Sequence, residues 1–139
     1  MMEVKQQPRM TFHGVDILNV KFDSTKMFVS NGDEKIDIET NPRVFYPSDT
    51  PNHFKIIMDV NLKVNDYFTL EILGIGNFEL ENIAEEAEKK NFVNINAPAI
   101  MFPYVRSFIT TFTANLGGST GALMIPVHFF SGDLEEIIN

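Results

Sequence analysis

The chain has 139 residues, a formal net charge of −8 and no cysteine. Its length fits one domain with a buried core, and the lack of cysteine excludes disulfides, thiolate zinc sites and cysteine nucleophiles. Scattered basic residues in an acidic chain argue against nucleic-acid binding, which needs clustered lysine and arginine to displace counterions from phosphates. The N-terminus lacks the apolar segment of a secretory signal, and the longest apolar run, 97–105, is too short to span a bilayer. We therefore expect a cytoplasmic protein without membrane insertion.

The first part of the chain has the pattern of two strands and a loop. Residues 10–23 predict a strand whose apolar phase shifts between Ile17 and Leu18. A strand face cannot change sides without a slip in the pleat, so we expect a bulge there. Residues 35–40 alternate between apolar and charged side chains and predict a second strand. Residues 41–52 contain three prolines and predict an irregular loop.

The clearest strand is predicted at 54–64, where every even position is apolar and polar side chains dominate the odd positions. This alternation is typical of an antiparallel strand with one buried face and one wet face. Residues 68–80 continue the pattern, and Gly74 and Gly76 within them predict a twist or the close approach of another segment. Four strands joined largely by short links indicate an antiparallel meander.

The pattern changes to helices after Leu80. Asn82 is expected to cap a short helix at 83–90. Apolar residues at helical spacing predict a longer helix at 97–116, and a last short helix is expected within 131–138. We expect one domain over residues 1–139, made of a loose N-terminus (1–9), a sheet (10–80) and a part with helices and a connecting loop (81–139).

No arrangement of residues in the sequence indicates catalysis or metal binding. His13, His53 and His128 are isolated and lack the spacing of a helical metal site. The glycine-rich stretch 117–121 follows a predicted helix, whereas a phosphate-binding loop needs a helix N-terminus after its glycines. We therefore expect no enzyme activity, no metal and no cofactor.

Two segments are more specific than the strand and helix patterns. Residues 96–106 read Asn-Ala-Pro-Ala-Ile-Met-Phe-Pro-Tyr-Val-Arg, and after a glycine-rich link residues 123–129 read Leu-Met-Ile-Pro-Val-His-Phe. In these segments the sequence resembles the bacterial protein-export chaperone SecB, and the similarity covers residues 10–130. The resemblance implies an α+β fold, in which a four-stranded antiparallel sheet with a crossover loop is backed by helices. It also implies a homotetramer that is a dimer of dimers.

The resemblance further implies a holding function that uses neither ATP nor a cofactor. SecB-type chaperones wrap unfolded presecretory polypeptides around hydrophobic grooves and pass them to the translocase motor SecA. Aromatic and aliphatic grooves accept diverse sequences because the hydrophobic effect is non-directional. The residues expected to line such client grooves here are Phe45, Tyr46, Phe68, Phe78, Phe129 and Phe130.

In the family, SecA docks on an acidic face of the sheet. Glu71 matches one of the acidic positions and Asp23 is expected to match another, whereas Asn19 falls where a third acid would be expected. The long helix supplies much of the tetramer interface in the family. The residues expected to do so here are Tyr104, Phe108 and Phe112.

Two other functions stay open at this point. SecB-like chaperones also include members dedicated to one partner, such as an antitoxin, and the altered docking position at Asn19 fits such a specialist. The second alternative belongs to another class. A curved antiparallel sheet closed by a helix can form a cone that binds a small ligand or performs acid–base chemistry, which requires a carboxylate or histidine buried inside the cone.

Overall fold

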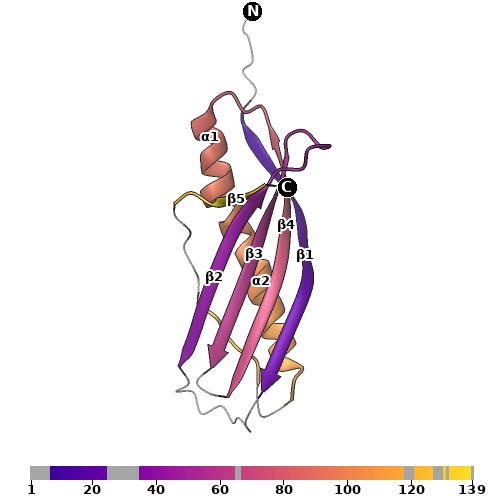
Figure 1. Ribbon diagram of the computed structural model, residues 1–139, viewed down its shortest axis with the longest axis vertical. Coiled ribbons are helices and arrows are strands. Elements are labelled where there is room, and N and C mark those ends of the chain that lie inside the picture. Colours follow the sequence, from indigo (N-terminus) through magenta and orange to yellow (C-terminus); the bar gives the residue numbers. More distant parts are fainter. Residues whose placement is uncertain are drawn as a thin grey trace, which may run out of the picture.

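The sheet has five strands. The computed structural model of the chain describes residues 7–24, 35–64, 67–117, 121–126, 130 and 132–138. The strands are β1 (Arg9–Ser24), β2 (Ile36–Phe45), β3 (His53–Val64), β4 (Phe68–Glu81) and β5 (Glu135–Ile137). They lie in the order β1-β4-β3-β2-β5 (Figure 1), in which β5 is parallel to β2 and all other neighbours are antiparallel. The predicted α+β class is confirmed, but the prediction of four strands is wrong because the C-terminal segment adds a fifth. The predicted meander is also wrong, because β1 pairs with β4 and not with β2.

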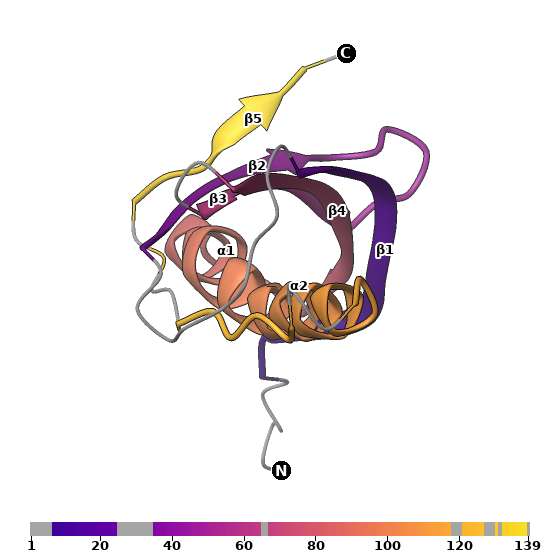
Figure 2. The ribbon, with the colours of Figure 1, turned by 90° about the horizontal axis from the view of Figure 1, so that it is seen from below.

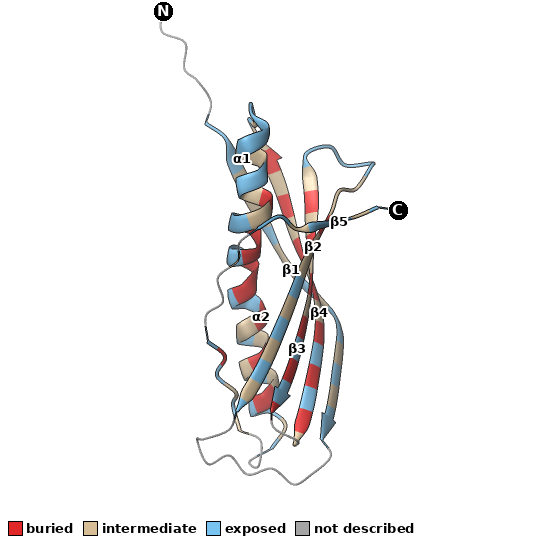
Figure 3. Ribbon diagram, turned by 60° about the vertical axis from the view of Figure 1, so that its left-hand side comes forward, coloured by how far each residue is buried: buried red, intermediate tan, exposed pale blue. Residues whose placement is uncertain are grey.

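The central strands β3 and β4 carry most of the core. Their even-numbered residues are all buried, whereas their odd-numbered residues are half-buried or exposed. We call the sheet face with the even positions of β3 and β4 the inner face, and the opposite face the outer face. Figure 3 shows the resulting alternation of colour along both strands. The alternation predicted at 54–64 and 68–80 is therefore confirmed, because one face packs against the rest of the chain and the other meets solvent.

Strand β1 bends at two irregularities. Its register with β4 shifts between Ile17 and Asn19, as the sequence predicted, and also between Phe12 and Val15. Gly14, in the second irregularity, has a φ of 107°, a conformation that residues with a Cβ atom rarely adopt. The two shifts allow the apolar residues of β1 to pack against the core despite their changing phase.

Strand β2 is longer than the sequence predicted. It continues through Pro42 to Phe45, so that only 46–52 form the connection to β3, whereas the prediction was an irregular loop over 41–52. Proline lacks the N–H donor of a sheet ladder, but an edge strand tolerates it because one side of its backbone needs no partner. Apart from its three pairs with β5, β2 is such an edge strand.

One continuous helical segment packs against the inner face. It consists of helix α1 (Glu86–Asn91), the π-helical turn η1 (Phe92–Asn96) and helix α2 (Ala97–Ala114). The N–H of Ala97 bonds to the carbonyl of Phe92, five residues earlier. Pro98 cannot continue the α-helical ladder because it has no N–H, and a wider π turn can form at such an interruption. The two helices predicted as separate are therefore joined.

The first helix also begins later than predicted. Asn82 has a positive φ of 59°, and its side-chain amide donates to the carbonyl of Gln7 at 3.3 Å. Helix α1 starts at Glu86 without a side-chain cap. The prediction that Asn82 caps this helix is therefore wrong, because its amide ties the chain back to the start of β1.

Helix α2 approaches β4 most closely at two glycines. A Cβ atom added to Gly76 would lie 2.9 Å from Met101 Sδ, and one added to Gly74 would lie 3.4 Å from Met101 Cε. Met101 itself is fully buried. Figure 2 shows the sheet curving around the helices, with α2 inside the curve. The close approach predicted at these glycines is confirmed, and we call this contact the glycine notch.

Hydrogen bonds from Thr113 and Thr110 hold the chain after α2 in place. The buried Thr113 hydroxyl lies 2.8 Å from the Ile109 carbonyl oxygen and accepts from the Leu123 N–H at 2.8 Å. The Thr110 hydroxyl donates to the Leu123 carbonyl at 2.9 Å. Residues 121–126 are thereby tied to the helix without forming a helix or strand.

The predicted last helix within 131–138 is wrong. Residues 135–137 form β5, and Gly132 before them has a φ of 86°, which is incompatible with a helix. The open edge of β2 offers unpaired backbone groups with which a short segment can pair. Tertiary contacts thus override the local sequence pattern here.

Candidate functional site

Two clefts meet at Tyr46. The first, which we call the loop cleft, has a volume of about 370 Å³ and lies between the β2–β3 connection and the residues before and within α1, including Pro51 and Ile83. The second has a volume of about 200 Å³ and lies between β2, α1 and the C-terminal segment, and we call it the β2–α1 groove. Tyr46, Glu86 and Lys89 line both. The two clefts therefore form neighbouring parts of one hollowed surface.

The Tyr46 ring is half-buried and carries a cation on one face. Lys89 Nζ lies 4.7 Å from the ring centroid, within the range of a cation–π contact, and the Phe54 ring centroid is 6.3 Å away. Burial raises the pKa of Tyr46 above its ordinary value of 10.0, and the negative charges of Glu136 and Glu86 raise it further. Tyr46 thus offers a neutral phenol with an apolar ring to whatever enters the clefts.

Phe45 lies beside Tyr46 but on the other face of the sheet. Val44 before it is buried on the inner face, whereas Phe45 is half-buried. Its register partners are Lys55 on β3 and Ile137 on β5. Phe45 and Tyr46 thus bracket the end of β2, one on each face, and both keep the partial exposure that a client-binding residue needs.

Two of the aromatic residues predicted to line a client groove lie in the core instead. Phe68 is 2% exposed and Phe78 is 1% exposed. The Phe78 ring centroid is 5.2 Å from those of Phe12 and Phe54. Both residues occupy even positions of β4, which face the helices, so the prediction that they line an accessible groove of this subunit is wrong.

The remaining two predicted client-binding residues follow the glycine-rich link. Phe130 is half-buried, and its ring meets the Phe102 ring edge-on at 5.7 Å between centroids. Phe129 lies outside the described residues. Of the six predicted residues, Phe45, Tyr46 and Phe130 are therefore placed with partial exposure.

A third cleft collects acidic side chains on the outer face. It has a volume of about 290 Å³, and its lining includes Asp37 and Glu39 from β2 and Glu71 from β4. Lys63 is the basic residue of this lining. Asp23 is exposed at the end of β1, in register with Thr69, which also lines the cleft. The resemblance pointed to Glu71 and Asp23 but not to Asp37 and Glu39, although the alternation at 35–40 places both of these on one strand face.

Three aromatic side chains lie along α2 at intervals of one helical turn. Tyr104 is 54% exposed, and Phe108 and Phe112 are half-buried with ring centroids 5.8 Å apart. Tyr104 and Phe112 also meet aromatic rings of β1, at 5.0 and 6.2 Å between centroids. These three residues thus form a partly exposed apolar ridge, as an interface requires.

Within the described ranges, no helix is long and apolar enough to cross a membrane.

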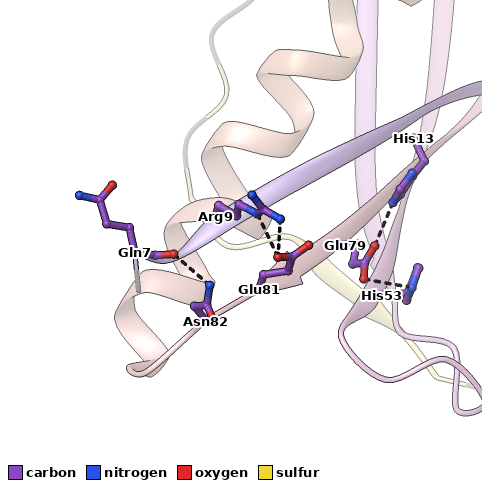
Figure 4. A network of polar contacts seen from close by, with 7 residues as sticks. All are labelled: Gln7, Arg9, His13, His53, Glu79, Glu81 and Asn82. Carbon is purple, nitrogen blue, oxygen red and sulfur yellow. Dashed lines mark hydrogen bonds and ion pairs between the residues drawn. The ribbon is translucent and has the colours of Figure 1, made fainter. Parts of the chain in front are cut away.

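Two histidines treated as isolated in the sequence analysis lie around one carboxylate (Figure 4). His13 Nε2 is 3.1 Å from Glu79 Oε1, and His53 Nε2 is 3.8 Å from Glu79 Oε2. The imidazole rings are nearly parallel, with centroids 6.0 Å apart. The β3–β4 hairpin brings His53 beside Glu79, but the position of His13 depends on the β1–β4 pairing, which the sequence pattern did not indicate.

The described residues offer little to catalytic chemistry. Among them, no group of three or more histidine, aspartate or glutamate side chains could hold a metal ion. Thr113 is the one polar residue of the described part that is buried as a whole, and the Glu88 Oε2 atom is buried on a residue that is itself partly exposed. The small-ligand alternative requires a buried titratable group inside the curved sheet, and the described residues place none there.

The family assignment follows from sequence comparison. A family model for the preprotein translocase subunit SecB matches residues 4–131. This chain belongs to the SecB family. The protein-export protein SecB of Orientia tsutsugamushi (strain Ikeda) is 28% identical to this SecB-family chain over 143 residues, covering 97% of the chain and 82% of that protein. The protein of the same name from strain Boryong is 31% identical over 134 residues, covering 94% of the chain and 75% of that protein.

A solved SecB-like structure has the same fold. It is the Mycobacterium tuberculosis SecB-like chaperone Rv1957 in complex with a ChAD peptide from the HigA1 antitoxin. The TM-score is 0.67 and the sequence identity is 17%, over 86% of this SecB-family chain and 88% of the other. The resemblance to SecB inferred from residues 96–106 and 123–129 is thus confirmed at the level of family and fold.

The SecB-related predictions fall on separate surfaces of this SecB-family chain. Phe45 and Tyr46 lie at the end of β2, beside the two clefts. Glu71 and Asp23 lie on the outer face near the opposite end of the sheet, and the ridge that contains Tyr104 lies on α2. Three different partners could therefore contact the subunit without competing for the same residues.

Proposed function

We propose that this chain is a cytoplasmic chaperone that holds unfolded polypeptides without ATP and without catalysis. The observation that supports this proposal best is the pair of clefts that meet at Tyr46. The clefts combine apolar and charged side chains beside the end of β2, and Phe45 adds an aromatic ring on the other face of the same strand. Clefts of mixed polar and apolar lining next to a strand suit extended chains of varied sequence, because the hydrophobic effect is non-directional and strand pairing uses only the backbone.

The direct test is an aggregation assay. The purified protein, at a one-to-one ratio and without nucleotide, is expected to suppress the aggregation of a denatured preprotein measured by light scattering. Phe45→Ser/Tyr46→Ser is expected to lose most of this suppression. Leu18→Ser is the matched control. Leu18 is 61% exposed on β1, so this variant also removes an accessible apolar side chain, but away from the clefts. Equal suppression by both variants would remove the proposed groove while leaving the fold intact.

We further propose that the outer face binds SecA. The acidic cleft with Asp37, Glu39 and Glu71, with Asp23 near its rim, supports this proposal. Carboxylates concentrated on one face attract a basic partner, and their effect weakens as salt screens them. Binding of SecA, measured by calorimetry, is expected to fall with ionic strength and to be lost in Glu71→Lys.

We also propose a homotetramer in which the ridge of Tyr104, Phe108 and Phe112 is covered by another subunit. An exposed apolar ridge of this kind is costly to leave in water, and burial in an interface removes that cost. Multi-angle light scattering at micromolar concentration measures the mass directly. A strict monomer would count against both the interface and an extended client path across subunits.

The second candidate is a chaperone dedicated to one partner. It is supported by the structural likeness to Rv1957, which was solved with an antitoxin peptide, and by Asn19, which is neutral where the SecB pattern has an acid. The aggregation and SecA assays separate the two candidates. Suppression of aggregation together with an absence of SecA binding would favour the dedicated chaperone.

A further inference from the structure

The C-terminal segment occupies the same end of β2 that carries Phe45 and Tyr46. Strand β5 pairs in parallel with β2 over only three positions, Arg43–Glu135, Val44–Glu136 and Phe45–Ile137. The rest of the β2 edge, 36–42, has no strand partner on this side among the described residues. The chain thus adds its own short strand to an edge that could accept a longer one.

The residues before β5 are held against η1 by two hydrogen bonds of the Asn94 side-chain amide. Leu134 N–H donates to Asn94 Oδ1 at 3.0 Å, and Asn94 Nδ2 donates to Asp133 Oδ1 at 3.3 Å. The Leu134 side chain is half-buried and packs against the core cluster. One backbone donor, one apolar side chain and a strand ladder are the contacts by which a peptide ligand is recognised in strand-addition sites.

The charges around this segment are complementary. Glu136 lines the β2–α1 groove together with Lys89 and Lys90 of α1. Glu136 also lies close enough to Tyr46 to raise the pKa of its phenol. The groove therefore places two ammonium groups and an aromatic ring near the inward side chain of an inserted strand, together with one acidic residue of α1, Glu86.

On the outer face, the same segment covers Phe45. Ile137 is the register partner of Phe45, and register partners on neighbouring strands project their side chains to the same face. The segment thus lies beside Phe45 on the outer face and brings Glu136 near Tyr46 on the other face.

We propose that residues 133–137 occupy part of the client-binding site in cis and that an extended client segment displaces them by pairing with β2. The favoured segment has an apolar residue, two acidic residues and another apolar residue, the order found in Leu134-Glu135-Glu136-Ile137. This inference rests on the proposed holding function and adds a regulatory step to it. The C-terminal segment limits access to the site until a client offers a longer strand.

The segment is suited to displacement because its hold is short. Glu135 and Glu136 are exposed, and Ile138 after them is 85% exposed. A client that pairs along 36–45 would replace three ladder positions with up to ten. Because the segment belongs to the same chain, its effective concentration at the site is high. Only chains in which the segment is released can bind a client, so the apparent affinity for clients is the intrinsic affinity multiplied by the fraction of such chains.

The first test locks the segment in place in the full-length chain. Val44→Cys/Glu136→Cys puts two cysteines at register partners, and neighbouring strands are about 4.8 Å apart, within the Cα separation that a disulfide tolerates. The chain has no other cysteine, so mass spectrometry can verify this single bond. Oxidised and reduced forms of one variant then differ only in whether the segment can leave.

Two probes are used, both labelled for fluorescence anisotropy and both free of cysteine. One is a synthetic peptide with the sequence of residues 132–138, and the other is a permanently unfolded polypeptide. We expect the reduced form to bind each probe about tenfold more tightly than the oxidised form. Equal binding of both probes by the two forms would overturn the inference.

The second test releases the segment without a disulfide. Leu134→Ser removes the half-buried anchor and is expected to raise the affinity for both probes several-fold. Ile138→Ser is the matched control in the same segment, and because its side chain is exposed we expect no change. If Leu134→Ser and the reduced double variant both fail to bind the peptide, the strand site is excluded.

The two probes distinguish the inference from the proposed function. Redox-dependent peptide binding without binding of the unfolded polypeptide would support the strand site and reject the holding function. Redox-independent binding of both the polypeptide and the peptide would support the holding function and reject the cis-occupied strand site.

Discussion

The centre of the sheet and its β2 edge have the same strand geometry but differ in how far their aromatic side chains are buried. In β3 and β4, every even-numbered side chain is buried between the sheet and the helices, and even Phe68 and Phe78 are sealed there. At the end of β2, Phe45 and Tyr46 are only half-buried, next to two clefts and the short strand β5. The comparison teaches that position in the sheet decides whether an aromatic side chain is buried in the core or stays partly accessible, and that residue type does not.

The strongest test of this comparison removes the same side chain from both regions. Phe54→Ala deletes a fully buried ring that stacks on Phe78 at 5.2 Å, and such deletions cost about 3–5 kcal/mol in the free energy of unfolding. Phe45→Ala, in the edge region, should cost less, about 1–2 kcal/mol, because its ring is only partly buried and lies on the outer face of the sheet. Urea denaturation at one fixed protein concentration measures both. Similar losses in the two variants would contradict the distinction.

A second prediction concerns the polar attachment of the segment after α2. Thr113→Val keeps the shape of the side chain but leaves the Leu123 N–H without its acceptor, which should destabilise the protein by about 1–3 kcal/mol. Hydrogen exchange should show faster exchange of the Leu123 amide. Thr111→Val, at an exposed position of the same helix, serves as the control and should have little effect.

The third prediction refines the edge side of the comparison. Arg43 Nη2 and Asp59 Oδ2 are 2.6 Å apart across β2 and β3, and both side chains are about one-third exposed. A double-mutant cycle with Arg43→Ala and Asp59→Ala should give a coupling of about 0.5–1 kcal/mol, because solvent screens the pair. The coupling should shrink at high salt. A coupling that is insensitive to salt would indicate that this part of the edge is as closed as the core.

The smallest expected effect is a titration. The folded-state pKa of Tyr46 is above the ordinary 10.0, so the protonated phenol contributes stability that is fully present below about pH 10 and is lost as the pH rises through the folded-state pKa. Ultraviolet titration should therefore show one of the three tyrosines ionising late. Glu136→Gln should bring this ionisation to lower pH, and Tyr46→Phe should abolish it. An unchanged titration in Glu136→Gln would mean that the charge on β5 does not act on the Tyr46 phenol.

The sequence predicted the parts of the fold that follow from local periodicity. The alternation at 54–64 and 68–80 predicted β3, β4 and their buried face, and the phase shift at Ile17 predicted a bulge in β1. The same alternation places Phe68 and Phe78 among the buried positions, so their assignment to a client groove could have been avoided. An aromatic residue at a strand position that alternates with the buried face should be assigned to the core before a binding role is considered.

The parts that could not be predicted depend on contacts between distant segments. The sequence of 131–138 carries a weak helical pattern, and only the open β2 edge makes its strand form favourable. Likewise, His13 and His53 meet around Glu79 because β1 pairs with β4, which no local pattern indicates. The clefts at Tyr46 needed both the helical segment and the C-terminal segment in place.

The glycine notch also limits how the subunit can deform. The Met101 side chain fits over two residues without side chains, Gly74 and Gly76, and sliding α2 by one turn, about 5.4 Å, would carry it onto strand positions that have side chains. The helix and the central strands should therefore move as one rigid piece. Nuclear magnetic resonance relaxation should then show similar, restricted backbone motion for Met101 in α2 and for Gly74 and Gly76 in β4.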